Sequence, residues 1–230
     1  MRTILSFLGK KAFMIPAVIT SVIAAPIAAV LVLLSIGNPA GITYTPADYA
    51  SFLEKSGLTD GSNAEKASLF DLLTDNYVEG EPVSVNATFS SSEFTAYLNN
   101  SFAKTPGIED VQVKFCDHDK LVLSCKVTKG IASLLDDVPE AAGLKGYVWI
   151  AHGKTLRMEE TLTSAAGEII TKLDKIYVGQ IDVTGFVPKD AVPIGTILNI
   201  LFRTQDSEDF RFSEEGLVFN GSMPCQITKK

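Results

Sequence analysis

The order of hydrophobic and polar residues divides the chain into one long apolar run and a series of shorter periodic segments. The run, residues 12–37, contains no charged residue in 26 positions. As a helix it would be about 39 Å long, more than the ~30 Å that the hydrocarbon core of a bilayer requires. The run therefore predicts a transmembrane helix, and Pro26 in its middle predicts a kink near Ala25.

Basic residues lie on only one side of this run. Arg2, Lys10 and Lys11 precede it, whereas the next basic residue is Lys55. The positive-inside rule therefore predicts a cytoplasmic tail at 1–11, a single-pass signal anchor in the cell membrane at 12–37, and an extracytoplasmic remainder. The alternative is a cleaved secretory signal, although the apolar region of such a signal is usually about 7 to 15 residues long.

Residues 38–46 contain two prolines and a glycine and are predicted to be a short linker. Residues 47–230 follow as one extracytoplasmic domain that begins with helices. Thr45 is suited to cap a helix that has Pro46 in its first turn. Two S-x-x-E capping boxes, Ser62 with Glu65 and Ser90 with Glu93, predict the starts of two further helices.

Most of the remaining chain alternates apolar and polar residues with the period of two that is typical of strands. In residues 168–187 the first half has mixed spacing, so a helical turn is the alternative there. No βαβ unit repeats, which predicts an α+β domain with a large antiparallel sheet of hairpins packed against several short helices. The predicted strands occupy 82–89, 111–115, 120–127, 146–152, 154–163 and 168–187. A helix is predicted at 193–202, and residues 209–221 are predicted to form two strands around the turn "SEEG".

Charge and cysteine content narrow the possible partners. Beyond residue 37 the 20 basic residues fall by three to 17, against 27 acidic ones, a formal net charge of −10. This balance argues against nucleic acid and against direct electrostatic adhesion to anionic lipid headgroups. The three cysteines, Cys116, Cys125 and Cys225, allow at most one internal disulfide in an oxidising compartment, so one thiol stays free or pairs elsewhere.

The densest cluster of potential ligands is the stretch "FCDHDK", residues 115–120, which combines a thiol, an imidazole and two carboxylates. Apolar residues alternate on both sides of it, so we expect a loop between two strands. A metal ion needs three or four converging ligands, which neighbouring residues of one tight loop rarely supply. The stretch therefore predicts a hairpin loop, and neither a metal nor a cofactor is predicted.

Candidate catalytic residues are few. His118 lies in this loop and His152 precedes a glycine at an apparent hairpin turn, but no known nucleophile signature surrounds Cys116 or Ser124. Glu159 and Glu160 are adjacent on a strand, so they point to opposite faces, and each is predicted to be solvated. We expect no enzyme, and an extracytoplasmic hydrolase that uses His118 or His152 is the alternative.

Apolar residues give the other candidate site. Tyr147 and Trp149 alternate along one predicted strand, and the helix at 193–202 is largely apolar. Ordinary core packing explains this pattern, and the functional alternative is a groove for an acyl chain or a partner helix. The helix residues of this speculative groove are Ile194, Ile197, Leu198, Leu201 and Phe202.

Two stretches resemble a known family. "ATFSSSEFTAYLNNSF" (87–102) and "IYVGQIDVTGFVPKDAV" (176–192) are similar to segments of the YpmS-like proteins of Gram-positive bacteria, which have a signal anchor and one extracytoplasmic domain of unassigned function. The chain departs from that pattern in its helical insert, 45–77, and its three cysteines. The resemblance implies a non-enzymatic role at the cell envelope. The uncharged run and the apolar strands and helix of the domain favour an anchored protein that binds a lipid or protein partner, and a structural subunit of a membrane complex is a further alternative.

Overall fold

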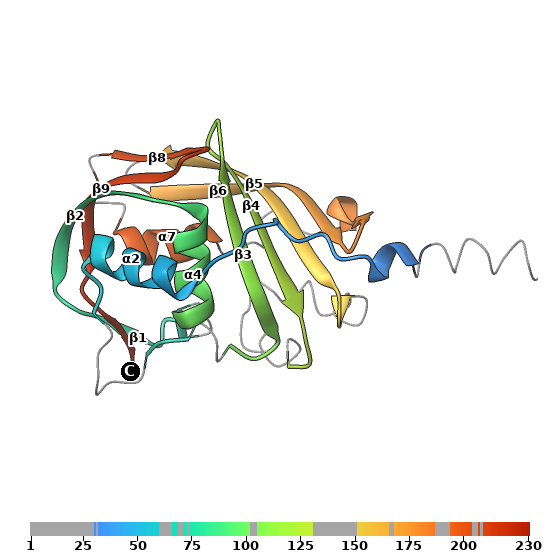
Figure 1. The fold of residues 1–230 in the computed structure, drawn as a ribbon, viewed down its shortest axis with the longest axis horizontal. Coiled ribbons are helices and arrows are strands. Elements are labelled where there is room, and N and C mark those ends of the chain that lie inside the picture. Colours follow the sequence, from blue (N-terminus) through green and yellow to red (C-terminus); the bar gives the residue numbers. More distant parts are fainter. Residues whose placement is uncertain are drawn as a thin grey trace, which may run out of the picture.

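The computed structural model confirms an α+β fold with a large antiparallel sheet and a few helices (Figure 1). Five strands form the largest sheet, in the order β3-β4-β5-β6-β7, and every pair within it is antiparallel. The structure describes residues 30, 32–59, 66–68, 71–72, 74–101, 105–130, 151–165, 168–186, 194–203, 207 and 209–230.

The strands of the five-stranded sheet agree closely with the alternation in the sequence. A bulge interrupts the pairing of β5 with β6, where Glu159 pairs with Lys175 but Glu160 pairs with Leu173, so that Asp174 has no partner residue. The bounds are β3 (Ile108–Cys116), β4 (Lys120–Val127), β5 (Thr155–Ala165), β6 (Glu168–Val178) and β7 (Ile181–Asp182).

Two smaller antiparallel sheets lie beside the large one. The first has the order β2-β9-β8 and brings residues far apart in sequence together, because Pro82 pairs with Pro224 and Phe89 with Leu217. The second joins β1 to β10 near the C-terminus. The bounds are β1 (Tyr77–Glu79), β2 (Pro82–Phe89), β8 (Asp209–Ser213), β9 (Gly216–Pro224) and β10 (Ile227–Lys229).

The described helices are α2 (Pro46–Ser56), α4 (Ser91–Ser101) and α7 (Ile194–Phe202), with a 3-10 helix, η2 (Thr184–Phe186). The predicted capping box at Ser90 is confirmed, because its amide donates to the Glu93 carboxylate at 2.8 Å and its hydroxyl accepts from the Glu93 amide at 3.2 Å. Lys55 forms an ion pair with the same carboxylate at 2.7 Å, which joins α2 to α4. Thr45 caps α2 as predicted.

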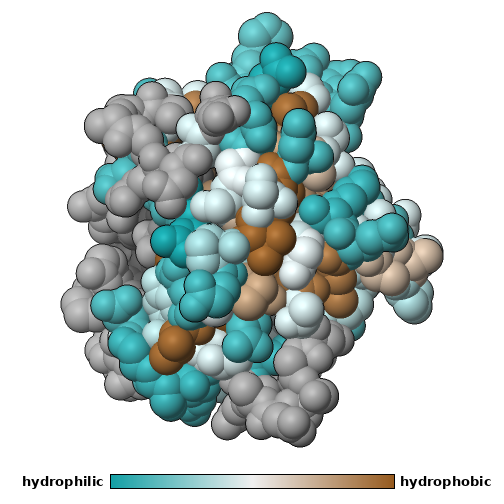
Figure 2. Space-filling view, turned by 90° about the vertical axis from the view of Figure 1, so that its left-hand side faces the viewer, coloured by the Kyte–Doolittle hydropathy of each residue, from teal (hydrophilic) through white to brown (hydrophobic). Residues whose placement is uncertain are grey.

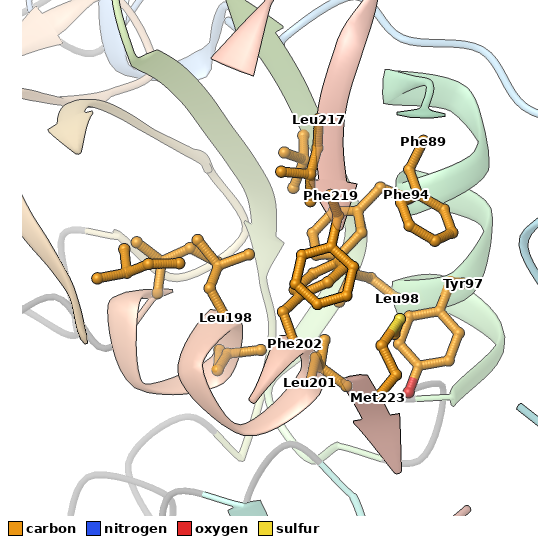
Figure 3. Packing of buried hydrophobic residues seen from close by; sticks show 14 of the residues in the cluster. Phe89, Phe94, Tyr97, Leu98, Leu198, Leu201, Phe202, Leu217, Phe219 and Met223 are labelled. Atoms are coloured by element: carbon orange, nitrogen blue, oxygen red, sulfur yellow. The ribbon is translucent and has the colours of Figure 1, made fainter. Parts of the chain in front are cut away.

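The main core lies where α4 and α7 meet the three-stranded sheet. Phe202 of α7 is fully buried, and its ring contacts those of Phe89, Phe94 and Phe219 at centroid separations of 5.7, 6.0 and 5.0 Å. Figure 3 shows these rings converging from the helices and strands. Aromatic clusters of this kind bury large areas and add specific ring contacts, so this region is the stable centre of the fold.

Several predictions fall on residues outside the described ones. These include residues 12–29 of the apolar run, the capping box of Ser62 and Glu65, and most of the strand predicted at 146–152. The end of the run is helical at residues 32–35. Within the described part of the chain, no helix has the length and apolar character needed to cross a membrane.

Candidate functional site

The five-stranded sheet has two faces of different character. On β5, Met158 and Leu162 point to the face that meets the hydrophobic clusters, which we call the core face. Arg157 and Glu159 point to the opposite face. We call this second face the strap face, because a segment from the N-terminal part of the chain, helical at its start and extended after residue 36, lies across it.

This segment, Leu33–Ile42, is the strap. In Figure 1 it is the blue trace that runs across the strands between the N-terminal helical turn and α2. Three polar residues on the strap face form a row across neighbouring strands, because Gln112 pairs with Ser124 and Ser124 pairs with Arg157. The strap crosses the sheet along this row.

Hydrogen bonds fix the strap to the row. The Ala40 amide donates to the Ser124 hydroxyl at 2.8 Å, and the amides of Gly41 and Ile42 both donate to the Gln112 side-chain oxygen, at 3.0 and 3.2 Å. Ser124 is 1% exposed and Gln112 9% exposed beneath the strap. The predicted linker is therefore bonded to the sheet as part of the domain, because its backbone amides need partners that these side chains supply.

The other end of the strap is held by the turn between β6 and β7. The Gln180 amide donates to the Leu33 carbonyl at 3.0 Å, and the Gln180 side chain donates to the Gly37 carbonyl at 3.2 Å. Gly179 has φ +61°, and a Cβ there would lie 2.5 Å from the Leu34 carbonyl oxygen. Only glycine permits both this conformation and this approach.

Sequence reasoning missed this arrangement. Gln112 and Ser124 are polar residues at alternate positions of two strands, and the same pattern is expected for a solvent-facing sheet surface. A local pattern does not tell whether water or another segment supplies the hydrogen-bond partners. Gln112, Ser124 and Arg157 are aligned across three neighbouring strands. This alignment is the signal that could have indicated the site, but it can be recognised only once the strand register is known.

Glu160 is the most unusual ionisable group of the sheet. Its side chain is fully buried on the core face between its register neighbours Leu121 and Leu173. Within the described part of the chain, neither carboxylate oxygen meets the geometric criteria for a hydrogen bond, and the nearby Thr171 side chain only offsets part of the rise in the pKa of Glu160. Burial raises the pKa of Glu160 to about 8, with a further contribution from the charge of Asp174.

The prediction that Glu160 is solvated is therefore wrong. Adjacent strand residues point to opposite faces, so one of the two glutamates had to enter the core face. Glu159 lies on the strap face, where it forms an ion pair with Arg157 at 3.0 Å. The two carboxyl groups do not share a cleft, and Glu160 carries a proton at neutral pH, which lowers the cost of its burial.

The stretch "FCDHDK" forms the hairpin loop that its flanks predict. Asp117, His118 and Asp119 are the exposed turn between β3 and β4, and His118 has φ +61°. The carboxylates bind the neighbouring β8-β9 hairpin, because Asp117 accepts from the Glu214 amide and Asp119 from that of Phe212. Among the described residues, no three metal-ligating side chains come together.

The two histidines lie far apart. His118 is beside the start of β4, whereas His152 is exposed in the turn that meets the end of β4, where the Gly153 amide donates to the Val127 carbonyl. The eight residues of β4 separate them by about 23 Å along the strand. They therefore do not contribute to one site.

All three cysteines are described, and all are free thiols. Cys125 is buried on the core face of β4, and burial raises its pKa to about 12. A thiol with such a pKa is not a nucleophile at neutral pH. Cys116 and Cys225 are half-buried and lie apart in the fold, because Cys116 ends β3 whereas Cys225 lies in the connection between β9 and β10.

The apolar residues predicted to line a groove divide into two groups. The five on α7 are between 0 and 6% exposed and belong to the main core. Contacts with neighbouring core residues account for all five, as ordinary packing would. Tyr147 and Trp149 lie outside the described residues, so a groove that includes them stays a prediction.

The fold and the strap together define the class of protein. It is an α+β domain whose five-stranded sheet binds, on one face, the end of a long uncharged apolar run and the residues that follow it. No family model, curated protein or solved structure matches the chain. The resemblance to YpmS-like proteins stays a prediction.

Proposed function

We propose that this chain is a single-pass membrane-anchored envelope protein of the YpmS-like kind, with its N-terminus in the cytoplasm. Its domain is non-catalytic and binds a lipid or protein partner. The observation that carries the proposal is the strap, because the uncharged run continues without interruption into a segment that is hydrogen-bonded to the sheet.

The strap favours a domain that is held in a fixed position relative to the membrane anchor over one that is loosely tethered to it. A flexible linker between anchor and domain would allow the domain to rotate freely. Here the bonds begin at the Leu33 carbonyl, inside the apolar run itself, and continue to Ile42. The domain is thus held at a fixed distance from the end of the anchor, which suits a protein whose partner lies in or beside the bilayer.

The positions of the reactive side chains support a non-catalytic role. His118 and His152 are at opposite ends of β4, and Glu160 is sealed in the core. If the hydrolase alternative holds, His118→Ala or His152→Ala will abolish an activity or cellular phenotype without lowering the thermal unfolding temperature. If both variants retain the phenotype of the parent protein, this alternative is removed.

Membrane anchoring is tested on the full chain in cells. We expect the protein to stay in membranes washed with alkaline carbonate and to be digested by protease added from outside. The control variant Ile23→Arg/Ile27→Arg places two charges in the run, each costing about 2.5 to 3.5 kcal/mol at the centre of a membrane helix, and should be released. Release of the unchanged protein by carbonate would contradict the proposal.

The partner is tested on the same preparation. Native mass spectrometry of the full chain, released from detergent, should detect a retained lipid if the domain binds one. Consistent absence of lipid removes the lipid version and leaves a protein partner. A structural subunit is distinguished by replacing 12–32 with a generic leucine-alanine segment, because only that role requires the specific sequence of the run.

A further inference from the structure

Exposed apolar side chains gather at one end of the five-stranded sheet. Of the eight large hydrophobic residues that are exposed in the described part of the chain, five lie either where the strap begins or in η2. Clusters of exposed apolar residues mark interaction surfaces more often than single ones do. These five residues are Val30, Val32, Leu33, Ile36 and Phe186.

Phe186 is the most exposed of them, at 66%. Its position is fixed by hydrogen bonds, because the Phe186 amide donates to the Val183 carbonyl at 2.9 Å and the Val183 amide donates to that of Ile176, also at 2.9 Å. The Thr184 hydroxyl accepts from the Ile176 amide at 3.0 Å. The 3-10 helix therefore presents the ring to the outside on a well-anchored turn.

The strap and η2 meet at the same turn of the sheet. Gln180, between β6 and β7, holds the Leu33 carbonyl, and η2 begins two residues after β7 ends. The uncharged run thus reaches the domain at the end of the sheet that carries Phe186. We call this end, residues 179–186 with Leu33–Gly37, the Phe186 end.

Other parts of the surface differ from this end. Figure 2 shows the face at the left-hand end of Figure 1, where apolar residues are interspersed with residues of intermediate hydropathy and surrounded by hydrophilic ones. Ile170 is also exposed, at 51%, but lies near the opposite end of β6. The eight residue-to-residue steps from Ile170 to Val178 place it about 26 Å from the Phe186 end.

We infer that the Phe186 end rests on the outer surface of the lipid bilayer and that the Phe186 ring inserts at the boundary between headgroups and acyl chains. This inference rests on the proposed membrane anchoring and adds the surface by which the domain meets the lipid. The run brings the bilayer to this end of the sheet, and Phe is among the apolar residues that segments lying in the membrane interface bury at the boundary between headgroups and acyl chains. The contact is apolar, since the net charge of −10 beyond residue 37 disfavours adhesion through basic residues.

The test uses the full chain in phosphatidylcholine nanodiscs that contain lipids brominated near the top of the acyl chains. Two variants each add one tryptophan, Phe186→Trp and Ile170→Trp, and Trp149 stays in place as a common background. A ring buried about 5 to 10 Å into the interface lies within reach of these bromines, so the added fluorescence at position 186 should fall about twofold relative to unbrominated lipid. The Ile170→Trp control should keep its added fluorescence unchanged.

The outcomes separate this inference from the proposed function. If the protein co-purifies with nanodiscs but Phe186→Trp is not quenched, or is quenched no more than Ile170→Trp, the inference is wrong while membrane anchoring stands. If emission at position 186 changes only when two copies share a disc, the surface binds a second copy, which also overturns the inference. Failure of the chain to enter nanodiscs at all contradicts the proposed function itself.

Discussion

The core face and the strap face of the same sheet are stabilised in different ways. The core face buries apolar side chains against α7 and the aromatic cluster, and Asn199 of α7 binds the backbone of Ile169 at its edge. The strap face offers polar side chains whose hydrogen-bond partners are backbone amides of the strap. Burial supplies most of the stability, whereas the strap bonds contribute little each and instead determine where the N-terminal run leaves the domain.

The largest effect is expected on the core face. Phe202→Ala removes a fully buried ring that contacts several others, and such a change costs about 3 to 5 kcal/mol of unfolding free energy. Urea unfolding of the detergent-solubilised full chain measures it. Phe186→Ala is the matched control, because that ring is 66% exposed and its loss should change stability by less than about 0.5 kcal/mol. Equal effects at the two positions would invalidate the distinction between core and surface.

Glu160 gives the second prediction, a dependence of stability on pH. Its pKa rises from an ordinary 4.5 to about 8 in the folded protein, so the folded state holds its proton more tightly than the unfolded state. Between these values the group's contribution to stability falls as pH rises, by up to about 1.4 kcal/mol per pH unit. Glu160→Gln removes this slope and should stabilise the protein by a few kcal/mol at pH 8.

The measurement is urea unfolding of both proteins at pH 5, 6, 7 and 8. Glu159→Gln is the control, because that carboxylate lies on the strap face and is paired with Arg157 in a partly exposed position. We expect Glu159→Gln to follow the pH profile of the parent protein within about 0.5 kcal/mol. If the unfolding free energies of Glu160→Gln and of the parent protein declined in parallel between pH 5 and pH 8, Glu160 would be ionised in the folded protein.

The smallest effect is expected on the strap face. Gln112→Ala leaves the amides of Gly41 and Ile42 without their acceptor, which should cost about 1 to 3 kcal/mol if water does not replace it. The more specific readout is faster hydrogen exchange at those two amides. Lys114→Ala, an exposed change on the same face of β3, should leave their exchange rates unchanged. Unaltered exchange in Gln112→Ala would mean that the strap is held by other contacts.

Local patterns predicted much of the fold. The strand expected at 82–89 has the bounds of β2, and that expected at 120–127 has the bounds of β4. The capping box of Ser90 and Glu93 begins α4, because both partners lie within one turn of each other. These features depend on residues that are neighbours in sequence, so a pattern of a few residues contains the information they need.

The candidate site was harder to predict. The strap consists of residues with little periodicity, and its partners Gln112 and Ser124 lie 71 and 84 positions further along the chain. Phe202 and the other α7 residues of the alternative groove pack in the core, as the ordinary explanation had it. The sequence could not decide between the two, since an apolar helix face has the same pattern whether it meets a ligand or a protein interior. Periodicity records that a residue is buried but not what buries it.

The sequence by itself determined the uncharged run, the strand alternation and the helix caps, because each depends on local composition or on spacing within one element. Only the tertiary structure decided that the residues after the run bind the strap face, that Glu160 and not Glu159 enters the core, and that Phe186 stands at the end where the run arrives. These outcomes depend on strand register and on contacts between distant segments, which bring together side chains that no local pattern relates.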